Sequence, residues 1–206
     1  MGYPAASDAI TYCGITDTDH ATMVGDMVNW AIQICETTTG RAFAVASSDV
    51  ETRYFNGELD VDGQTLWLDK DLLSVSLDTD GKPVIDAGAT DTVLSSSDIV
   101  YLPPNDTPKY AIKILGTSGK TWGYDYDADN AISVRGLWGF SSTPPLDIHY
   151  AILRLVKWIY NTRVQAGDLD RPLLTNDGVT IMPAKLPADV LSVFMQYKRP
   201  KMGVPF

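Results

Sequence analysis

The middle of the chain is divided into short pieces by three turn dipeptides, Asn56-Gly57, Asp62-Gly63 and Asp80-Gly81. Asn-Gly and Asp-Gly favour the tight turns of β-hairpins, because those turns need positive φ angles that few other residues adopt. Alternating apolar residues flank the turns, and the pieces between them have the length of strands. Residues 46–140 are therefore predicted to form a mostly antiparallel β region of five to seven short strands.

Residues 1–45 have the spacing of helices instead. A short helix is predicted to end at Gly14, and a longer one to run from a cap at Thr16 or Thr18 to Gly40. In the longer helix, apolar residues recur at helical spacing: Met23, Met27, Ala31 and Ile34.

Helical spacing returns in residues 141–206. Pro144 and Pro145 give the chain an extended entry, and a last helix is predicted from Pro187, followed by an extended basic tail. Between them an apolar stripe predicts a helix: Ile148, Ile152, Leu155 and Ile159. Helices this short seldom bury their apolar faces alone. The predicted fold class is therefore α+β, with the N- and C-terminal helices packed as a small bundle and the β region inserted, in one compact domain overall.

The net charge of −10 is unevenly distributed. Residues 1–130 contain 7 Lys and Arg against 21 Asp and Glu, whereas residues 131–206 contain 9 against 5. A body this acidic is not expected to grip nucleic acid, because that binding depends on neutralising phosphates. Charge alone leaves two roles open for the basic end: contact with an acidic partner, or a solvated tail.

Two compositional features bear on the compartment. The longest apolar runs are about one strand long, far below the roughly 18 residues that indicate a membrane span, so no membrane contact is predicted. Cys13 and Cys35 fall in apolar surroundings and are predicted to be buried, reduced thiols, which is consistent with folding in a cytoplasm.

Two stretches resemble ligand-binding motifs but lack essential residues. In GTSGKT, residues 116–121, the P-loop glycine is missing because Ile114 occupies its place, and no helix is predicted to follow. In DYDADNAISVRG, residues 125–136, Asn130 and Gly136 replace the Gly and Glu that a calcium loop requires. No cofactor and no metal site are therefore predicted.

The chain contains only two histidines, His20 and His149. Neither belongs to a metal-ligand spacing or to a local signature of a catalytic triad. Both are predicted to have structural or surface roles, so no catalytic residue and no enzymatic activity are predicted.

Four motifs follow one another along the chain. They comprise a helix that ends in TGR-F, a Tyr- and Phe-containing strand, an L-L strand followed by a glycine turn, and a late glycine-aromatic and proline stretch. Their residues are Thr39, Gly40, Arg41 and Phe43; Tyr54, Phe55 and Gly57; Leu66, Leu68, Leu73, Val75 and Gly81; and Gly139, Phe140, Pro145, Leu146, Asp147 and Ala151. In this order, which covers most of the chain, they resemble the head–tail connector (adaptor, or head-completion) family of long-tailed bacteriophages and gene transfer agents.

The resemblance implies a structural virion protein. Such a protein forms a homo-oligomeric ring, usually dodecameric, below the portal protein at the neck, after assembly in the host cytoplasm. The ring extends the DNA channel and docks the stopper or tail-completion protein. DNA is expected to pass through the lumen without sequence-specific binding, since an acidic wall repels phosphate.

Two segments are candidate contact sites. The C-terminal tail, residues 198–206, has little capacity to fold alone and is predicted to dock on the portal as an extended segment. Its candidate docking residues are Lys198, Arg199, Lys201, Val204 and Phe206. The other segment, which we call the joint, is predicted to connect the β region to the C-terminal helices and to pack against a neighbouring subunit. Its residues are Trp138, Phe140, Pro144 and Pro145.

The residues leave three alternatives open. The first is another neck protein, such as a stopper or tail-completion protein. The second is a monomeric ligand-binding β module, which the aromatic residues and acidic turns favour. The third is a hydrolase whose site is assembled in space, with His20 or His149 beside a carboxylate in a buried polar pocket.

Overall fold

The computed structural model describes residues 2–16, 21–88, 94–123, 132–162, 173–174, 180–181 and 186–199. The chain divides into two compact units. Met1–Gly40 and Thr143–Arg199 form what we call the helical unit, and we call Arg41–Ser142 the sheet unit. Within the described residues, the chain therefore passes between the units twice. The predicted α+β class is confirmed, while the prediction that the chain acts as one compact domain stays a prediction.

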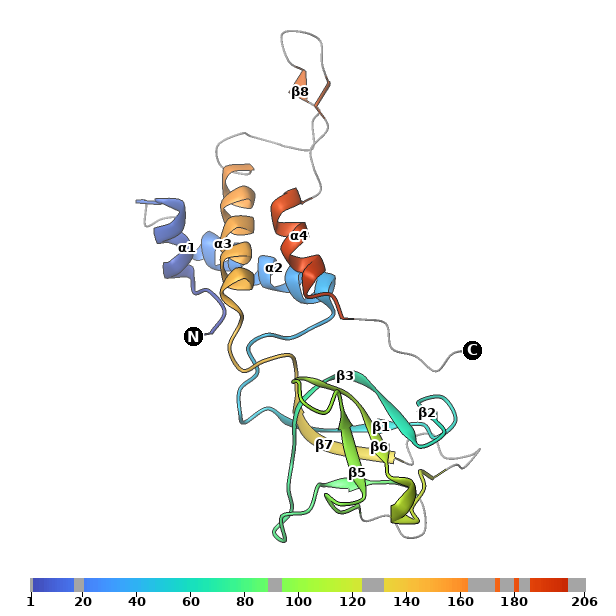
Figure 1. Ribbon diagram of the computed structural model, residues 1–206. Helices are drawn as coiled ribbons and strands as arrows, with labels where there is room; N and C mark the ends of the chain where they lie inside the picture. The colour runs from blue at the N-terminus through green and yellow to red at the C-terminus, as the bar shows by residue number, and fades with distance from the viewer. Residues whose placement is uncertain are drawn as a thin grey trace. The chain divides into compact units, whose positions relative to one another are not determined.

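Within the described residues, the helical unit contains four α-helices: α1 (Ala6–Cys13), α2 (Ala21–Thr39), α3 (Leu146–Tyr160) and α4 (Ala188–Gln196). Helix α3 lies between α1 and α4 and contacts both, while α2 crosses behind and contacts all three (Figure 1). The predicted packing of N- and C-terminal helices is confirmed. In the described part of the chain, no helix has the length and apolar character needed to cross a membrane.

Apolar stripes hold these helices together. Nine of the fifteen residues of α3 are buried, including all four of the predicted stripe. The neighbouring helices contribute Val24, Met27, Val28, Ala31 and Cys35 from α2, and Val190 and Phe194 from α4. Burial of one large apolar side chain contributes roughly 1.5–3 kcal/mol, so the stripes are the main source of stability in this unit.

Glycines end the first two helices, as predicted. Gly14 follows α1 with a φ of 70°, and Gly40 follows α2 with a φ of 68° and donates its N–H to the Glu36 carbonyl at 2.8 Å. Glycine adopts this left-handed conformation without steric cost. Of the two predicted caps for α2, Thr18 lies outside the described residues.

Both cysteines are free thiols, as predicted. Cys35 is buried on α2, and burial, with a smaller effect of Glu36, raises the pKa of its thiol to about 12. The predicted burial is therefore confirmed for Cys35 only, because Cys13 is half-buried at the end of α1.

One seven-stranded antiparallel sheet forms the described part of the sheet unit, in the order β1-β7-β3-β6-β5, with β2 paired to β3 and β4 paired to β7. The strands are β1 (Val50–Phe55), β2 (Val61–Asp62), β3 (Thr65–Val75), β4 (Ile85–Asp86), β5 (Ile99–Leu102), β6 (Lys109–Ile114) and β7 (Ile132–Trp138). The predicted five to seven antiparallel strands are confirmed. A separate hairpin, β8 (Leu173–Leu174) with β9 (Thr180–Ile181), precedes α4.

Strand β3 is shared between two parts of the sheet. Its first half pairs with β6, with Trp67 opposite Ala111, and its second half pairs with β7, with Val75 opposite Gly136. Leu66 and Leu68 belong to the buried core of the unit. Because side chains alternate along a strand, Trp67 between them lies on the opposite face of the sheet.

Two of the predicted turns have the expected glycine geometry. Gly63, with a φ of 59°, lies in the tight turn between β2 and β3, and Gly81, with a φ of 75°, lies in the turn at residues 78–82. The Asp78 carboxylate stabilises the second turn by accepting the N–H groups of Asp80 at 2.9 Å and Lys82 at 2.8 Å.

Candidate functional site

A buried ion pair lies where the chain enters the sheet unit. The Nη1 of Arg41 is 3.3 Å from Oδ2 of Asp71, and the two side chains are only 5% and 2% exposed. The guanidinium also lies over two rings, 4.7 Å from the Phe140 centroid and 5.7 Å from the Tyr110 centroid. Arg41 therefore binds the entering chain to β3, β6 and the segment after β7.

The entering and leaving segments of the sheet unit are bonded to each other. Phe43 is fully buried with its ring centroid 5.3 Å from that of Phe140. Phe140 donates its N–H to the Ala42 carbonyl at 2.8 Å, and Val45 donates to the Ser141 carbonyl at 3.2 Å. This contact explains the TGR-F motif physically, because Gly40 ends a helix and Arg41 and Phe43 anchor the next segment.

A glycine is required at the point of closest approach between these segments. A Cβ atom added to Gly139 would overlap the Val45 side chain and would lie 3.1 Å from the Ala42 carbonyl oxygen. Gly139 also donates its N–H to the Asp71 carbonyl at 2.8 Å. Any larger residue here would force the two segments apart.

Trp138, a predicted joint residue, packs inside the sheet unit. It is 6% exposed, its ring centroid is 6.1 Å from that of Phe55, and its Nε1 donates to the Glu51 carbonyl at 3.0 Å. Little of its surface is left for another chain. Its part in subunit packing, like that of half-buried Phe140, stays a prediction.

The two prolines of the joint belong to the helical unit. Pro144 is buried, and Pro145 immediately precedes α3 with φ −53° and ψ 147° and accepts the His149 N–H at 3.0 Å. Asp147 in the first turn of α3 accepts the Tyr197 hydroxyl at 2.8 Å. Burial, followed by this hydrogen bond and the charge of Asp147, raises the pKa of Tyr197 to about 12.

Only the start of the C-terminal tail lies within the described residues. Lys198 is exposed, and Arg199 is half-buried and donates its N–H to the Thr39 carbonyl at 2.8 Å. The tail thus starts beside Thr39, the last residue of α2. The chain passes into the sheet unit just after this point, between Gly40 and Arg41. Lys201, Val204 and Phe206 lie outside the described residues.

The described parts of the two stretches that resemble ligand motifs have other structures. Gly116–Ser118 form a short 3-10 helix, and no α-helix follows in residues 119–123. Lys120 forms an ion pair with Asp98 at 3.3 Å. The aspartates of the calcium-like stretch lie outside the described residues, whereas residues 132–136 belong to β7.

The histidines give no support to the hydrolase alternative. His149 is 6% exposed on α3, its Nδ1 has no hydrogen-bond partner among the described residues, and its ring contacts Tyr150 edge-on at 5.7 Å. His20 lies outside the described residues. In the described ranges, no three His, Cys, Asp or Glu side chains are grouped as metal ligands would be.

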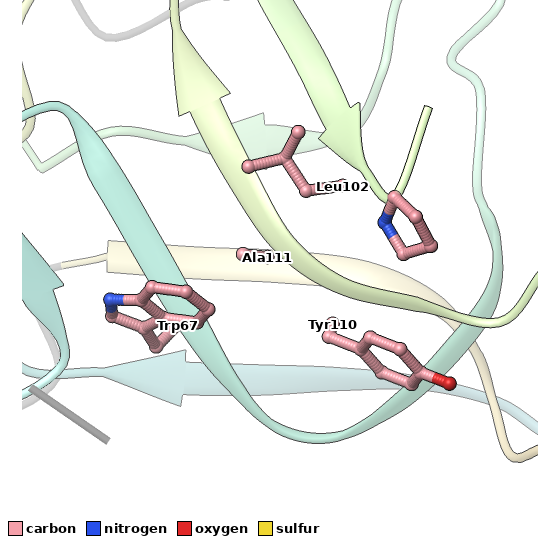
Figure 2. A pocket seen from close by; sticks show the side chains of 5 residues that line it. Trp67, Leu102, Tyr110 and Ala111 are labelled. Carbon is pink, nitrogen blue, oxygen red and sulfur yellow. The ribbon is translucent and has the colours of Figure 1, made fainter. Parts of the chain in front are cut away.

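An apolar groove that the sequence did not indicate lies on the outer face of the sheet. Its volume is about 300 Å³, and it is lined by Trp67, Leu102, Pro103, Tyr110 and Ala111. Figure 2 shows Trp67 and Tyr110 on either side of Ala111, with Leu102 across from them. Antiparallel pairing of Trp67 and Leu102 with Ala111 brings these residues together, and no local pattern contains that register.

The sheet unit is also the more acidic of the two units. Residues 41–142 contain 8 Lys and Arg against 16 Asp and Glu, a net charge of −8. Positive charge on a partner would therefore favour its binding to this unit.

Comparison with known proteins identifies a shared fold. No family model and no curated protein matches the chain. A chain from the neck of an empty gene transfer agent (GTA) particle, computed with C6 symmetry, is similar with a TM-score of 0.57 and 15% identity, over 96% of this chain and 90% of that chain. A chain from the neck of a native GTA particle, computed with C12 symmetry, has a TM-score of 0.52 and 14% identity, over 96% and 91%. At these identities the likeness shows a common fold.

Proposed function

We propose that the chain is a structural component of the neck of a tailed, DNA-filled particle of the phage or gene transfer agent type. The observation that carries the proposal is the fold likeness to GTA neck chains, which extends over 96% of the chain and so includes both units. Symmetric neck reconstructions with C6 and C12 symmetry support a homo-oligomeric ring, with twelve copies as the expected number.

In this proposal the ring lies below the portal protein, extends the DNA channel and docks the stopper or tail-completion protein. The net charge of −8 on the sheet unit supports a channel role, because like charge keeps DNA from adhering to the wall. A ring structure with a strongly basic lumen would contradict this part.

The C-terminal tail is the proposed portal-docking segment. Its first residues are held to α2 through the bond between Arg199 and Thr39, which leaves the residues after Arg199 to reach a partner. Removal of residues 198–206 is expected to abolish attachment to the portal and to leave the subunit folded. Normal joining of the truncated chain to capsids would contradict the docking role.

Mass photometry and negative-stain microscopy of the purified chain, with and without its portal, test the proposal. Rings that form alone or only on the portal are the expected result. A chain that stays monomeric and never joins the portal would contradict the proposal. If the chain instead lies below a ring that another neck protein forms, it would be identified as a stopper.

A monomeric ligand-binding module is the second candidate, and the aromatic groove is the observation that favours it. It predicts that the isolated monomer binds a carbohydrate or another small ligand on the Trp67 face. Titration of the monomer with a glycan panel, with tryptophan fluorescence as the readout, separates the two candidates, because only the ligand-binding module is expected to respond.

A further inference from the structure

The groove leaves a substantial apolar surface uncovered. Ala111, at its floor, is fully buried, but the four larger residues around it are only half-buried. A volume of about 300 Å³ accommodates an aromatic or two aliphatic side chains. Removing apolar surface from water is favourable by roughly 25 cal/mol per Å², so an apolar segment within reach will be drawn to this face.

The walls of the groove are fixed before anything binds. Lys109 donates to the carbonyls of Pro103 and Pro104 at 2.7 and 3.0 Å and so holds this turn against β6. On the other side, the Arg41 guanidinium lies over the Tyr110 ring. A preformed groove requires little ordering of the protein when a segment binds.

We propose that the groove is the docking site of the chain's own C-terminal segment, residues 200–206, in the unassembled protein. The proposal goes beyond the neck function and does not depend on ring formation. Its three supports are the chemistry of the segment, its charge and its reach.

The chemistry of the segment suits an apolar groove. Four of the seven residues of PKMGVPF, besides Pro200 at its start, have apolar side chains: Met202, Val204, Pro205 and Phe206 make up these four. Proline restricts the free segment and lowers the entropic cost of docking. Lys201, together with Lys198 and Arg199, is attracted to a sheet unit with a net charge of −8.

The segment also starts close to the groove along the chain. Arg199 is bonded to Thr39, and Arg41, two residues further on, touches Tyr110 in the groove wall. Two residue steps cover less than about 8 Å, while seven extended residues span up to about 23–25 Å. The extended segment is therefore longer than the two residue steps along the chain that separate Thr39, the partner of Arg199, from Arg41.

Fluorine NMR of the full chain labelled with 5-fluorotryptophan tests the proposal, because Trp67 reports on the groove. Its resonance is assigned with Trp67→Phe, and Trp30 on α2 is the internal control. The Trp67 resonance is expected to shift when residues 200–206 are deleted and, in the full chain, with Phe206→Ser. A synthetic peptide of residues 198–206 should restore the original position in the truncated chain.

Three results would overturn the proposal. The Trp67 resonance stays in place when the segment is removed, or the Trp30 resonance shifts as much as that of Trp67. A Trp67 shift that appears only at high protein concentration, together with dimers in mass photometry, would assign the groove to a second copy. All these measurements use the unassembled chain, so a failure to form rings leaves their outcome unaffected.

Discussion

The helical unit and the sheet unit each contain an Arg–Asp pair at a similar distance but in opposite surroundings. Arg154 and Asp189, on α3 and α4, are 3.1 Å apart with side chains 45% and 59% exposed. Arg41 and Asp71 are 3.3 Å apart and almost fully buried. Water screens the first pair, whereas the charge of the buried Arg41 lies against the Asp71 carboxylate and two aromatic rings.

The difference indicates how each unit is held together. Apolar stripes are the main contact between the helices, and the surface pair adds little. In the sheet unit, the buried pair and the bonds between residues 42–45 and 140–141 fix the path of the entering and leaving chain. Substitutions at matched positions in the two units should therefore differ widely in their effects.

The largest loss is expected from Asp71→Ala. It removes the carboxylate that pairs with the buried Arg41, which should lower the free energy of unfolding by about 3–5 kcal/mol in urea titrations. The double variant Arg41→Met with Asp71→Leu is the control and should be far closer to the parent, because it removes both charges. A single variant within about 1 kcal/mol of the parent would show that the pair is not a core element.

A somewhat smaller loss is expected from Ile152→Ala in the α3 stripe. The truncation leaves a cavity in the helical core and should lower the free energy of unfolding by about 2–4 kcal/mol, measured by circular dichroism at the helical band. Ile152→Val is the matched control, with an expected loss of about 1 kcal/mol. Equal effects of the two variants would argue against tight packing around α3.

Tyr197→Phe is expected to have a moderate, pH-dependent effect. At neutral pH it removes the hydrogen bond to Asp147 and should cost about 1 kcal/mol. The pKa of Tyr197 is raised from 10.0 to about 12. The protonated hydroxyl therefore contributes fully to the free energy of unfolding below pH 10, and this contribution is lost as the pH rises through 12. Urea titrations between pH 8 and 12 should therefore show a weaker alkaline loss of stability in the variant.

Tyr101→Phe in the sheet unit is the comparison for that prediction. Burial alone raises the pKa of Tyr101 to about 12, so this variant should lose the alkaline dependence with little cost at neutral pH. If Tyr101→Phe lowered the free energy of unfolding at neutral pH as much as Tyr197→Phe does, the bond between Tyr197 and Asp147 would add nothing to stability.

The smallest effect is expected from Arg154→Ala. Exposed pairs contribute about 0.2–1 kcal/mol, and salt should remove most of the difference from the parent. Thermal unfolding at low and high ionic strength measures it. A loss as large as that of Asp71→Ala would overturn the contrast between the two units.

What the sequence revealed depends on how far apart the interacting residues lie. The α3 stripe, the glycine helix ends and the hairpin turns are local patterns, and the structure confirms them. The pairing of Arg41 with Asp71 and the groove at Trp67 depend on the register of β3 with β6 and β7, which no local pattern contains. Trp138 belongs to the predicted joint, yet its partners are Glu51 and Phe55, far away in the chain.

The central proposal is that this chain is a structural component of a symmetric neck, and cryo-electron microscopy of the particle that contains it tests this most directly. The account predicts a ring of copies between portal and tail, with the acidic sheet unit towards the DNA channel. A reconstruction in which the chain is absent from the neck, or is present as a single copy away from the channel, would contradict it.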